Sequence, residues 1–516
     1  MYPGAYVASN PDKPAVVMAG DDGEILTYAR LEERSVRLAN AFTEAGLHPG
    51  DVVALLGENS PRVFEVYWAA LRSGLYLTAV NWHLAAPEVE YILRDCGASA
   101  IVASSTLRHL VDAAAGEFPA LRTRIAIGGG AGYLDYEQVL AGSSAEPAAD
   151  QPRGGDMLYS SGTTGRPKGI KPLLPERQVQ EPGDPYVGVF GPLYGFDENT
   201  VYLSPAPLYH AAPLRFGMIT TSLGGTVVVM PSFDAEAAVR EIARHRVTHS
   251  QWVPTHFVRM LRLPVAVRGG YDLSSHRVAI HAAAPCPVDV KRQMIEWWGP
   301  ILEEYYASTE GAGGTFISSA DWLQHPGSVG RPMIGIPRIC DDAGNELPTG
   351  ETGLIYFERD DLPFEYHNDP EKTRKAQHPK HETWTTMGDV GRMDEQGYLY
   401  LSDRKAFTII SGGVNIYPQE IEDALLQHPA VLDVAVIGVP DPEFGESVLA
   451  VVQLVAGASA SDETRASLIA FARDRLAGFK VPRQIEFTDD LPRTPTGKLV
   501  KGKLRDIYGA STSASA

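Results

Sequence analysis

The stretch YSSGTTGRPKG, Tyr159 to Gly169, gathers glycines, hydroxyl side chains and a lysine within eleven residues. Glycines let a backbone come close to a ligand, and the Ser, Thr and Lys168 side chains supply O–H and ammonium donors. This combination suits the binding of phosphate oxygens. The Gly-Lys-Ser/Thr ending of a Walker loop is absent. Composition alone leaves a flexible Ser/Gly linker equally open.

Helical and strand patterns alternate on both sides of this stretch through the first four hundred residues, which is typical of an α/β fold. Thr27 is placed to cap a helix that Gly46 ends. An apolar run at Val52–Leu56 predicts a strand. Ser60-Pro61 then opens a second helix, and Gly74 closes it.

The last hundred residues predict a separate small α/β module. Its boundary is expected near Asp403–Ala406, which gives an N-terminal domain of residues 1–403, a C-terminal domain of residues 404–508 and a disordered, low-complexity tail of residues 509–516. The elements expected in this module are helices at about Pro418–His428 and Glu463–Leu476 and strands at Val431–Val439, Val448–Val455 and Gln484–Phe487.

Composition limits the classes of function that fit this chain. A length of 516 residues predicts two to four domains or subdomains, and 44% hydrophobic with 21% charged residues is typical of a globular protein. The net charge of −19 argues against nucleic-acid partners. The three cysteines show no metal or disulfide spacing and are expected to be buried free thiols. Neither a signal peptide nor a membrane span is apparent, so a cytoplasmic protein is expected.

Further segments extend the pattern, and together with YSSGTTGRPKG they resemble the adenylate-forming superfamily, in particular its AMP-forming acyl-CoA synthetases. The resemblance covers about Tyr28 to Arg505. The segments are PLYHAAP (Pro207–Pro213), HAAAPCP (His281–Pro287), YYASTEG (Tyr305–Gly311), WTTMGDVGRMDEQGYLYLSDRK (Trp384–Lys405) and LPRTPTGKLVKGKLR (Leu491–Arg505). The resemblance implies a large adenylation domain of layered α/β subdomains plus a small β subdomain, followed by a small, mobile α+β domain.

The resemblance also implies the residues that handle ATP. By this resemblance the Tyr306 ring stacks on adenine, Thr309 meets phosphate and Glu310 binds Mg²⁺. Asp389 accepts hydrogen bonds from both ribose hydroxyls, and Arg404 holds the ribose or the phosphate side. Lys498 is the catalytic lysine, acting with Thr163 and Glu310. The full set implied to bind ATP or AMP is Ser160, Ser161, Gly162, Thr163, Thr164, Gly165, Lys168, Ala283, Ala284, Pro285, Tyr305, Tyr306, Ala307, Ser308, Thr309, Asp389, Arg404 and Lys498.

Two further sets of residues are expected to hold the acid and coenzyme A. Apolar and aromatic residues around His210 are the candidates for an acyl pocket, and the loop SGGVNIYP (Ser411–Pro418) is expected to meet the thiol arm. The acyl set is Tyr209, His210, Phe216, Gly217, Trp252 and Thr255, and the coenzyme A set is Gly412, Gly413, Phe444, Lys480 and Arg483.

The implied activity is acid–CoA ligation, in which an acid, ATP and coenzyme A give acyl-CoA, AMP and pyrophosphate through an acyl-adenylate. A fatty or other hydrophobic acid is expected, with an aryl or steroid-type acid as the alternative. The enzyme is expected to be a monomer or homodimer. Two other functions stay open at this point: loading of a carrier-protein thiol, and nucleotide binding without catalysis. Some residues depart from the family pattern, such as Pro213 beside the acyl pocket and Phe407 after the expected hinge.

Overall fold

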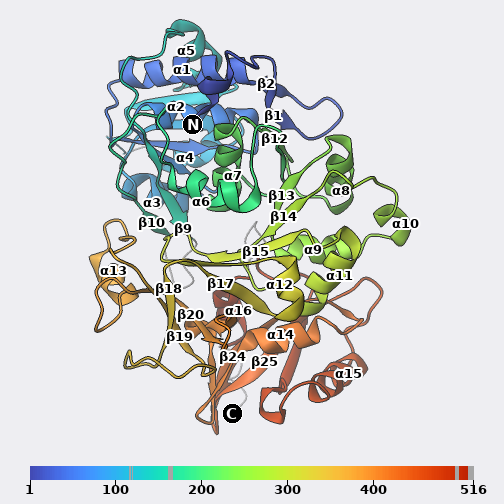
Figure 1. Ribbon diagram of the computed structural model, residues 1–516. Coiled ribbons are helices and arrows are strands. Elements are labelled where there is room, and N and C mark those ends of the chain that lie inside the picture. The colour runs from blue at the N-terminus through green and yellow to red at the C-terminus, as the bar shows by residue number, and fades with distance from the viewer. Residues whose placement is uncertain (115–117, 119, 161–166, 494–498, 510–516) are drawn as a thin grey trace.

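The computed structural model describes residues 1–114, 118, 120–160, 167–493 and 499–509 (Figure 1). It has α/β architecture, as the sequence predicts. Among the described residues, two large sheets and a two-stranded one lie in a large N-terminal region, and a five-stranded sheet lies in a smaller C-terminal region. Helices cover both N-terminal sheets (Figure 1). Among the residues described, no helix combines the length and apolarity that a bilayer crossing requires.

The first sheet is parallel and six-stranded, in the order β7-β6-β5-β3-β4-β8. Parallel sheets need crossover connections, and helices supply them here. Its strands are β3 (Val52–Leu56), β4 (Tyr76–Ala79), β5 (Ala98–Ser104), β6 (Thr123–Ile127), β7 (Leu134–Asp135) and β8 (Gly155–Asp156). The helices of this part are α1 (Tyr28–Glu44), α2 (Pro61–Arg72), α3 (Ala86–Asp95), α4 (Arg108–Ala114) and α5 (Tyr136–Gly142), after the short 3-10 helix η1 (Pro3–Tyr6).

Local signals in the sequence predict where the first two long helices, α1 and α2, begin and end. Thr27 caps α1, because its hydroxyl accepts a hydrogen bond from the Arg30 amide at 3.3 Å. Gly46 follows α1 with a φ of +78°, the left-handed conformation that glycine adopts easily. Ser60 stands at the predicted cap of α2, but its side chain makes no cap hydrogen bond, so Pro61 is the effective start signal.

The second sheet has thirteen strands, in the order β18-β19-β20-β21-β17-β16-β15-β14-β13-β11-β12-β1-β2. The run from β1 to β15 is parallel, whereas β16 to β21 are antiparallel. The strands are β1 (Pro14–Met18), β2 (Ile25–Thr27), β11 (Val201–Ser204), β12 (Thr226–Val229), β13 (His249–Trp252), β14 (Val278–His281), β15 (Leu302–Ala307), β16 (Gly314–Ile317), β17 (Ser328–Ile334), β18 (Ile336–Cys340), β19 (Gly353–Glu358), β20 (Thr385–Met393) and β21 (Leu399–Arg404).

Two separate apolar cores pack against this large sheet. One joins β1, β12 and α7 to the first sheet and contains Phe64, Tyr202 and Phe216. The other contains Trp252 and Trp322 and packs under α8, α9 and α11. The helices are α6 (Pro185–Tyr194), α7 (Ala211–Ser222), α8 (Ala235–Arg244), α9 (Pro254–Leu261), α10 (Val265–Arg268), α11 (Val288–Trp298), α12 (Ser319–Gln324) and α13 (Pro370–Ala376), and the small hairpin is β9 (Leu158–Ser160) with β10 (Lys168–Ile170).

The C-terminal region is a five-stranded sheet with its own apolar core, built on the elements that the sequence predicts. It also touches the N-terminal region, since Arg262 Nη2 donates to the Leu432 carbonyl at 2.8 Å. Its elements are η2 (Lys405–Phe407), β22 (Ile409–Ser411), β23 (Val414–Ile416), α14 (Pro418–Leu425), β24 (Val431–Asp441), β25 (Gly445–Leu454), α15 (Asp462–Arg473), η3 (Gly478–Lys480), β26 (Gln484–Thr488) and α16 (Lys501–Tyr508).

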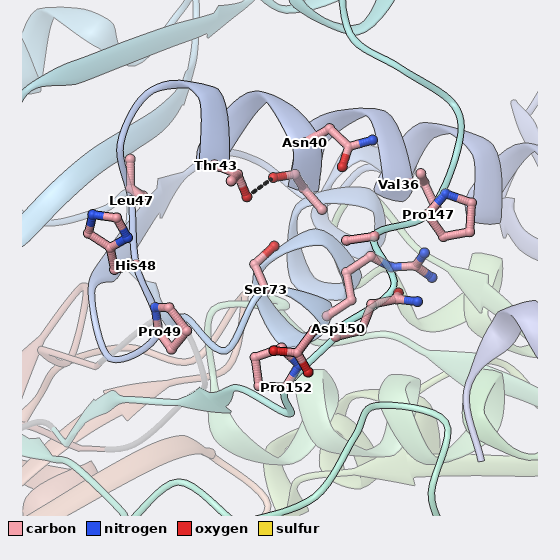
Figure 2. Close-up of a pocket in the computed structure, with 14 residues that line it drawn as sticks. Val36, Asn40, Thr43, Leu47, His48, Pro49, Ser73, Pro147, Asp150 and Pro152 are labelled. Carbon is pink, nitrogen blue, oxygen red and sulfur yellow. Dashed lines mark hydrogen bonds between the residues drawn. The ribbon is translucent and has the colours of Figure 1, made fainter.

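A surface pocket of about 210 Å³ lies between α1, the end of α2 and the loop before β8 (Figure 2). Its lining includes Asn40, Thr43, His48 and Gln151. None of the residues predicted to bind ATP, acid or coenzyme A lines it. This pocket is therefore not the predicted site.

Three buried histidines make the fold sensitive to acid. His249, His256 and His276 are between 2% and 7% exposed. Burial lowers the pKa of His249 to about 4 and the pKa values of His256 and His276 to about 3. The folded protein keeps these rings neutral, whereas an unfolded chain would let them bind protons near pH 6.5. The stability that these three histidines contribute is thus fully present above about pH 6.5 and is lost as the pH drops toward 4.

We expect the thermal unfolding midpoint to fall clearly between pH 7 and pH 5.5. Each of these histidines should cost about 1.4 kcal/mol of unfolding free energy per pH unit below 6.5. Differential scanning fluorimetry across this range measures the effect. The exposed His48 is a matched control, and His48→Ala should keep the same profile. A midpoint that stays constant from pH 7 to pH 5 would contradict the expected proton linkage.

Candidate active site

Three residues predicted from two motifs meet on strands β15, β20 and β21 of the large sheet. The Tyr306 hydroxyl on β15 donates to Asp389 Oδ2 at 2.6 Å. Asp389 Oδ1 lies 3.1 Å from Arg404 Nε, and the two residues face each other across β20 and β21. Burial raises the pKa of Tyr306 well above its usual value, and the Asp389 carboxylate raises it further, so the hydroxyl stays a donor. The group offers an aromatic face beside a carboxylate and a guanidinium.

A second group forms around Glu310, just after β15. The Tyr366 hydroxyl donates to Glu310 Oε1 at 3.0 Å, and Lys168 Nζ lies 4.7 Å from the centroid of the Tyr366 ring. Burial lowers the pKa of Lys168, and the nearby Glu310 charge opposes that change. An ammonium and a carboxylate thus share one aromatic neighbour at the edge of the site.

The β9–β10 hairpin carries Lys168 toward this group. Ser160 pairs with Lys168 across the two strands, where the first sheet meets the large one (Figure 1). The loop residues predicted to hold phosphate, Ser161, Gly162, Thr163, Thr164 and Gly165, lie outside the described residues. The hairpin brings both described ends of the loop to the Glu310 side of the site.

The predicted adenine loop contains a strained residue. Ala283 has a φ of +76°, which is uncommon for any residue with a side chain. Such strain is concentrated at ligand sites. Ala283, Ala284 and Pro285 are all exposed just beyond β14, so a flat ligand can reach them. In the neighbouring segment Ala307, Ser308 and Thr309 are half-buried, and Ser308 Oγ has no hydrogen-bond partner among the described residues.

Tyr305 points away from Tyr306, because successive side chains of a strand face opposite sides of a sheet. Its ring centroid lies 5.5 Å from that of Phe190 and 6.1 Å from that of Phe216. The structure thus places the Tyr305 ring beside Phe190 and Phe216, on the opposite face of the strand from Tyr306.

The six predicted acyl-pocket residues do not converge on one spot. The Tyr209 and His210 rings lie just before α7 in a tilted arrangement, with their centroids 4.3 Å apart. Burial lowers the pKa of His210 to about 3, which keeps it neutral. Trp252 instead lies in the other core, 5.5 Å from Trp298, and Thr255 starts α9 on that side. Gly217 serves helix packing, since a Cβ there would come within 2.8 Å of Phe64. Tyr209, His210 and Phe216 are the acyl candidates that the fold keeps together.

Three of the predicted coenzyme A residues lie together in the C-terminal region. Gly412 N donates to the Phe444 carbonyl at 2.8 Å, and Arg483 Cζ lies 4.1 Å from the centroid of the Phe444 ring. Gly412 and Gly413 both have positive φ angles, +57° and +79°. Lys480 is bound to Glu420 of α14 at 2.6 Å, so a ligand would have to compete for it.

Lys498 lies outside the described residues, but the helix that follows it, α16, is anchored near the expected hinge. Lys501, three residues further along the same lysine-rich segment, is only 5% exposed. Its Nζ lies 2.8 Å from Glu422 and 5.3 Å from the centroid of the Phe407 ring. Arg505 donates to the Ala406 carbonyl at 3.0 Å. Because β21 runs through Arg404, a hinge that keeps the Asp389–Arg404 pair falls just after it.

Two family models match successive parts of the chain. Residues 5–364 match the model described as AMP-binding enzyme, and residues 420–498 match AMP-binding enzyme C-terminal domain. The chain belongs to the AMP-binding enzyme family. This confirms the resemblance to adenylate-forming acyl-CoA synthetases and the prediction of an enzyme.

Relatives of this AMP-binding enzyme differ in the acids that their names give. A feruloyl-CoA synthase of Amycolatopsis sp is 36% identical, with 94% of this chain and 95% of that one covered. A long-chain-fatty-acid–CoA ligase of Mycobacterium tuberculosis is 32% identical, with 94% of each covered. The crystal structure of the anthranilate CoA ligase AuaEII with anthranoyl-AMP superposes with a TM-score of 0.85 at 26% identity, covering 99% of this chain and 97% of that one.

Two residues near the candidate site, Tyr366 and Arg215, are not among those predicted from the sequence. Tyr366 joins Lys168 to Glu310, yet a single tyrosine in a loop gives no signal of its own. Arg215 is a cation within the apolar run of α7, and a charge in such a run needs a buried partner. That signal was present in the sequence, and the partner is Asp156, 2.8 Å from Arg215 Nε.

Proposed function

We propose that this AMP-binding enzyme is an AMP-forming acid–CoA ligase that acts on a hydrophobic carboxylic acid. The observation that carries the proposal is the arrangement around β15. On one face of β15, Tyr306, Asp389 and Arg404 offer an aromatic ring, a carboxylate and a guanidinium to a nucleotide. Glu310 and Lys168 lie beside them, joined through Tyr366. The Tyr305 ring on the other face joins an aromatic cluster suited to an apolar acid.

The first step joins the acid to AMP. A carboxylate oxygen attacks the α-phosphorus of ATP, an acyl-adenylate forms and pyrophosphate leaves. Both reactants are anions, so the barrier falls when cations offset the developing charge. Lys168 stands on the phosphate side, and Lys498 is proposed to act at the reacting phosphate. Asp389 accepts the ribose hydroxyls and fixes the nucleotide against the acid.

In the second step the thiol of coenzyme A attacks the acyl carbon, loses its proton, and AMP leaves. Gly412 and Gly413 leave room for a thiol arm to pass close to the backbone. We propose that the C-terminal domain turns about the segment Lys405–Phe407 between the steps, so that Lys498 leaves and the Gly412 loop enters.

Magnesium is the metal that this chemistry implies, and Glu310 fits it. Protein-bound Mg²⁺ usually takes one or two carboxylates together with substrate phosphates and water. Glu310 is one carboxylate, and Tyr366 occupies only its Oε1. The bound ion would neutralise phosphate charge. The described residues hold no cluster of three or more His, Cys, Asp or Glu, so a binding site made of protein alone is not expected there.

The ribose role predicts the behaviour of Asp389→Asn. The amide keeps one acceptor oxygen but loses the charge that strengthens hydrogen bonds, so the KM for ATP should rise about tenfold. Steady-state pyrophosphate release against ATP concentration measures this, with the exposed Asp360→Asn as a charge-matched control. An unchanged KM for ATP would remove Asp389 from the nucleotide site.

Product analysis tests the proposed function directly. The protein, ATP and Mg²⁺ are mixed with fatty, aryl and steroid acids, with and without coenzyme A, and products are identified by mass spectrometry. Acyl-CoA with AMP is the expected result. Acyl-adenylate with no thioester from any acid would point to a carrier-protein thiol instead. No ATP consumption across the panel, with ATP still bound, would favour a nucleotide-binding protein without catalysis.

A further inference from the structure

A buried ion pair lies beside the acid side of the site. Arg215 projects from α7, and its Nε lies 2.8 Å from Asp156 Oδ2 on β8. The Arg215 and Asp156 side chains are 12% and 9% exposed. Neither residue figured among the predicted site residues. A cation in this position changes what the surrounding aromatic residues can bind.

Aromatic rings surround this pair. Arg215 Cζ lies 4.3 Å from the centroid of the Tyr186 ring on α6. Phe190, one helical turn further along α6, packs against Tyr305 at 5.5 Å. The Arg215 charge also acts on Tyr305: burial raises the pKa of that hydroxyl, and the guanidinium opposes the rise. Arg215 thus contacts the ring one helical turn before Phe190, the residue that packs against Tyr305.

The guanidinium still has donors to offer. Among the described residues, Arg215 donates a hydrogen bond only through Nε, to Asp156. Neither Nη1 nor Nη2 is among the fully buried atoms that lack a partner. Arginine carries five N–H groups, so the four on its Nη atoms are available to a ligand. Tyr186, Phe190 and Tyr305 are each half-buried, so solvent also reaches the rings around it.

We propose that Arg215, held by Asp156, determines specificity by donating hydrogen bonds to an oxygen at the far end of the acid substrate. The proposal rests on the proposed ligase function and narrows its substrate class. The acid would be an aryl acid that carries a hydroxyl, methoxyl or carbonyl oxygen on its ring. The rings would hold its flat body, and Arg215 would recognise its polar end.

The charge balance of the pair excludes two other classes of acid. Asp156 neutralises Arg215, so a second carboxylate on the substrate would meet no net positive charge. A plain fatty chain would displace water from the Nη donors without replacing its hydrogen bonds, and buried donors without partners are costly. A site built to hydrogen-bond a substrate rejects the analogue that lacks the matching group. A neutral oxygen acceptor satisfies both conditions.

Matched acids test the proposal on the whole enzyme. Adenylation of 4-methoxycinnamate, cinnamate and nonanoate is followed by pyrophosphate release, and kcat/KM is compared. We expect the wild-type protein to favour the methoxylated acid over cinnamate by tenfold or more, in the range that hydrogen bonds to charged donors give. Equal use of the two cinnamates, or a preference for nonanoate, would overturn the proposal while leaving the ligase function intact.

The double variant Arg215→Met with Asp156→Asn removes both charges together, so no unpaired charge is left buried. Its methoxylated-to-plain ratio should fall close to one, and an unchanged ratio would overturn the role of Arg215. The single variant Asp156→Asn leaves the cation uncompensated, and it should raise the use of 4-carboxycinnamate relative to 4-methoxycinnamate about tenfold. No such rise in a variant that unfolds at the wild-type temperature would count against the proposal. If the wild-type protein forms no adenylate from any acid, the ligase function itself fails.

Discussion

Lys498→Ala is expected to slow acyl-adenylate formation about a thousandfold, the scale seen when one charge-stabilising donor is removed from an active site. Carboxylate and triphosphate repel each other, and an ammonium at the reacting phosphate offsets charge that grows in the transition state. The second step needs no such cation. Thioester formation from a supplied acyl-adenylate should therefore continue at close to the wild-type rate.

Two assays separate these half-reactions. Exchange of labelled pyrophosphate into ATP reports the first, and release of AMP from a synthetic acyl-adenylate with coenzyme A reports the second. Lys503→Ala is the matched control, because Lys503 is exposed on α16 and five residues away. An equal loss in both assays would show that Lys498 supports the fold rather than the first step.

Lys501 is not a suitable control, although the sequence makes it look like one. It is buried against Glu422 and Phe407, so its removal would leave a buried carboxylate without its partner. Two lysines in the same charged run thus have opposite surroundings. Only the packing of α16 against α14 and η2 distinguishes them, and a linear sequence carries no trace of that packing.

Local patterns predicted most of the fold because the relevant signals lie within a few residues of each other. The cap at Thr27, the glycine at Gly46 and the apolar run Val52–Leu56 each fix an element without outside help. The C-terminal strands were predictable for the same reason. However, β24 continues two residues past its predicted end, and β25 begins three residues before its predicted start. Element ends depend on pairing partners, which local patterns do not describe.

The nucleotide side was predictable because its residues sit within specific strings. Tyr306, Asp389 and Arg404 came from two motifs, and the fold brings them within hydrogen-bond distance. The residues of the proposed acid site were not predictable in this way. The walls of a pocket are formed by side chains from distant segments, which only the fold brings together. Trp252 and Phe216 both looked suitable, yet they lie in different cores. Arg215 looked like an isolated charge until β8 placed Asp156 against it.

Among variants of the proposed magnesium site, Glu310→Gln is expected to have the largest effect. The amide keeps an oxygen for the Tyr366 hydroxyl, so the local hydrogen bond survives while the charge that attracts a cation is lost. Loss of a residue that only orients a metal ligand costs tenfold to a hundredfold in metal affinity, so loss of the ligand itself should cost about a hundredfold or more. The Mg²⁺ concentration for half-maximal pyrophosphate release should rise accordingly.

Tyr366→Phe makes the test specific, because it removes only the hydroxyl that orients Glu310. It should shift the same Mg²⁺ titration about tenfold, less than Glu310→Gln and in the same direction. The surface variant Glu371→Gln, which breaks an exposed pair with Lys375, should leave the titration where it is. If Glu310→Gln lowers the maximal rate at every Mg²⁺ concentration without moving the midpoint, the carboxylate acts on substrate charge and not through the metal. A Tyr366→Phe shift equal to that of Glu310→Gln would mean that the tyrosine, rather than the acid, sets the affinity for the ion.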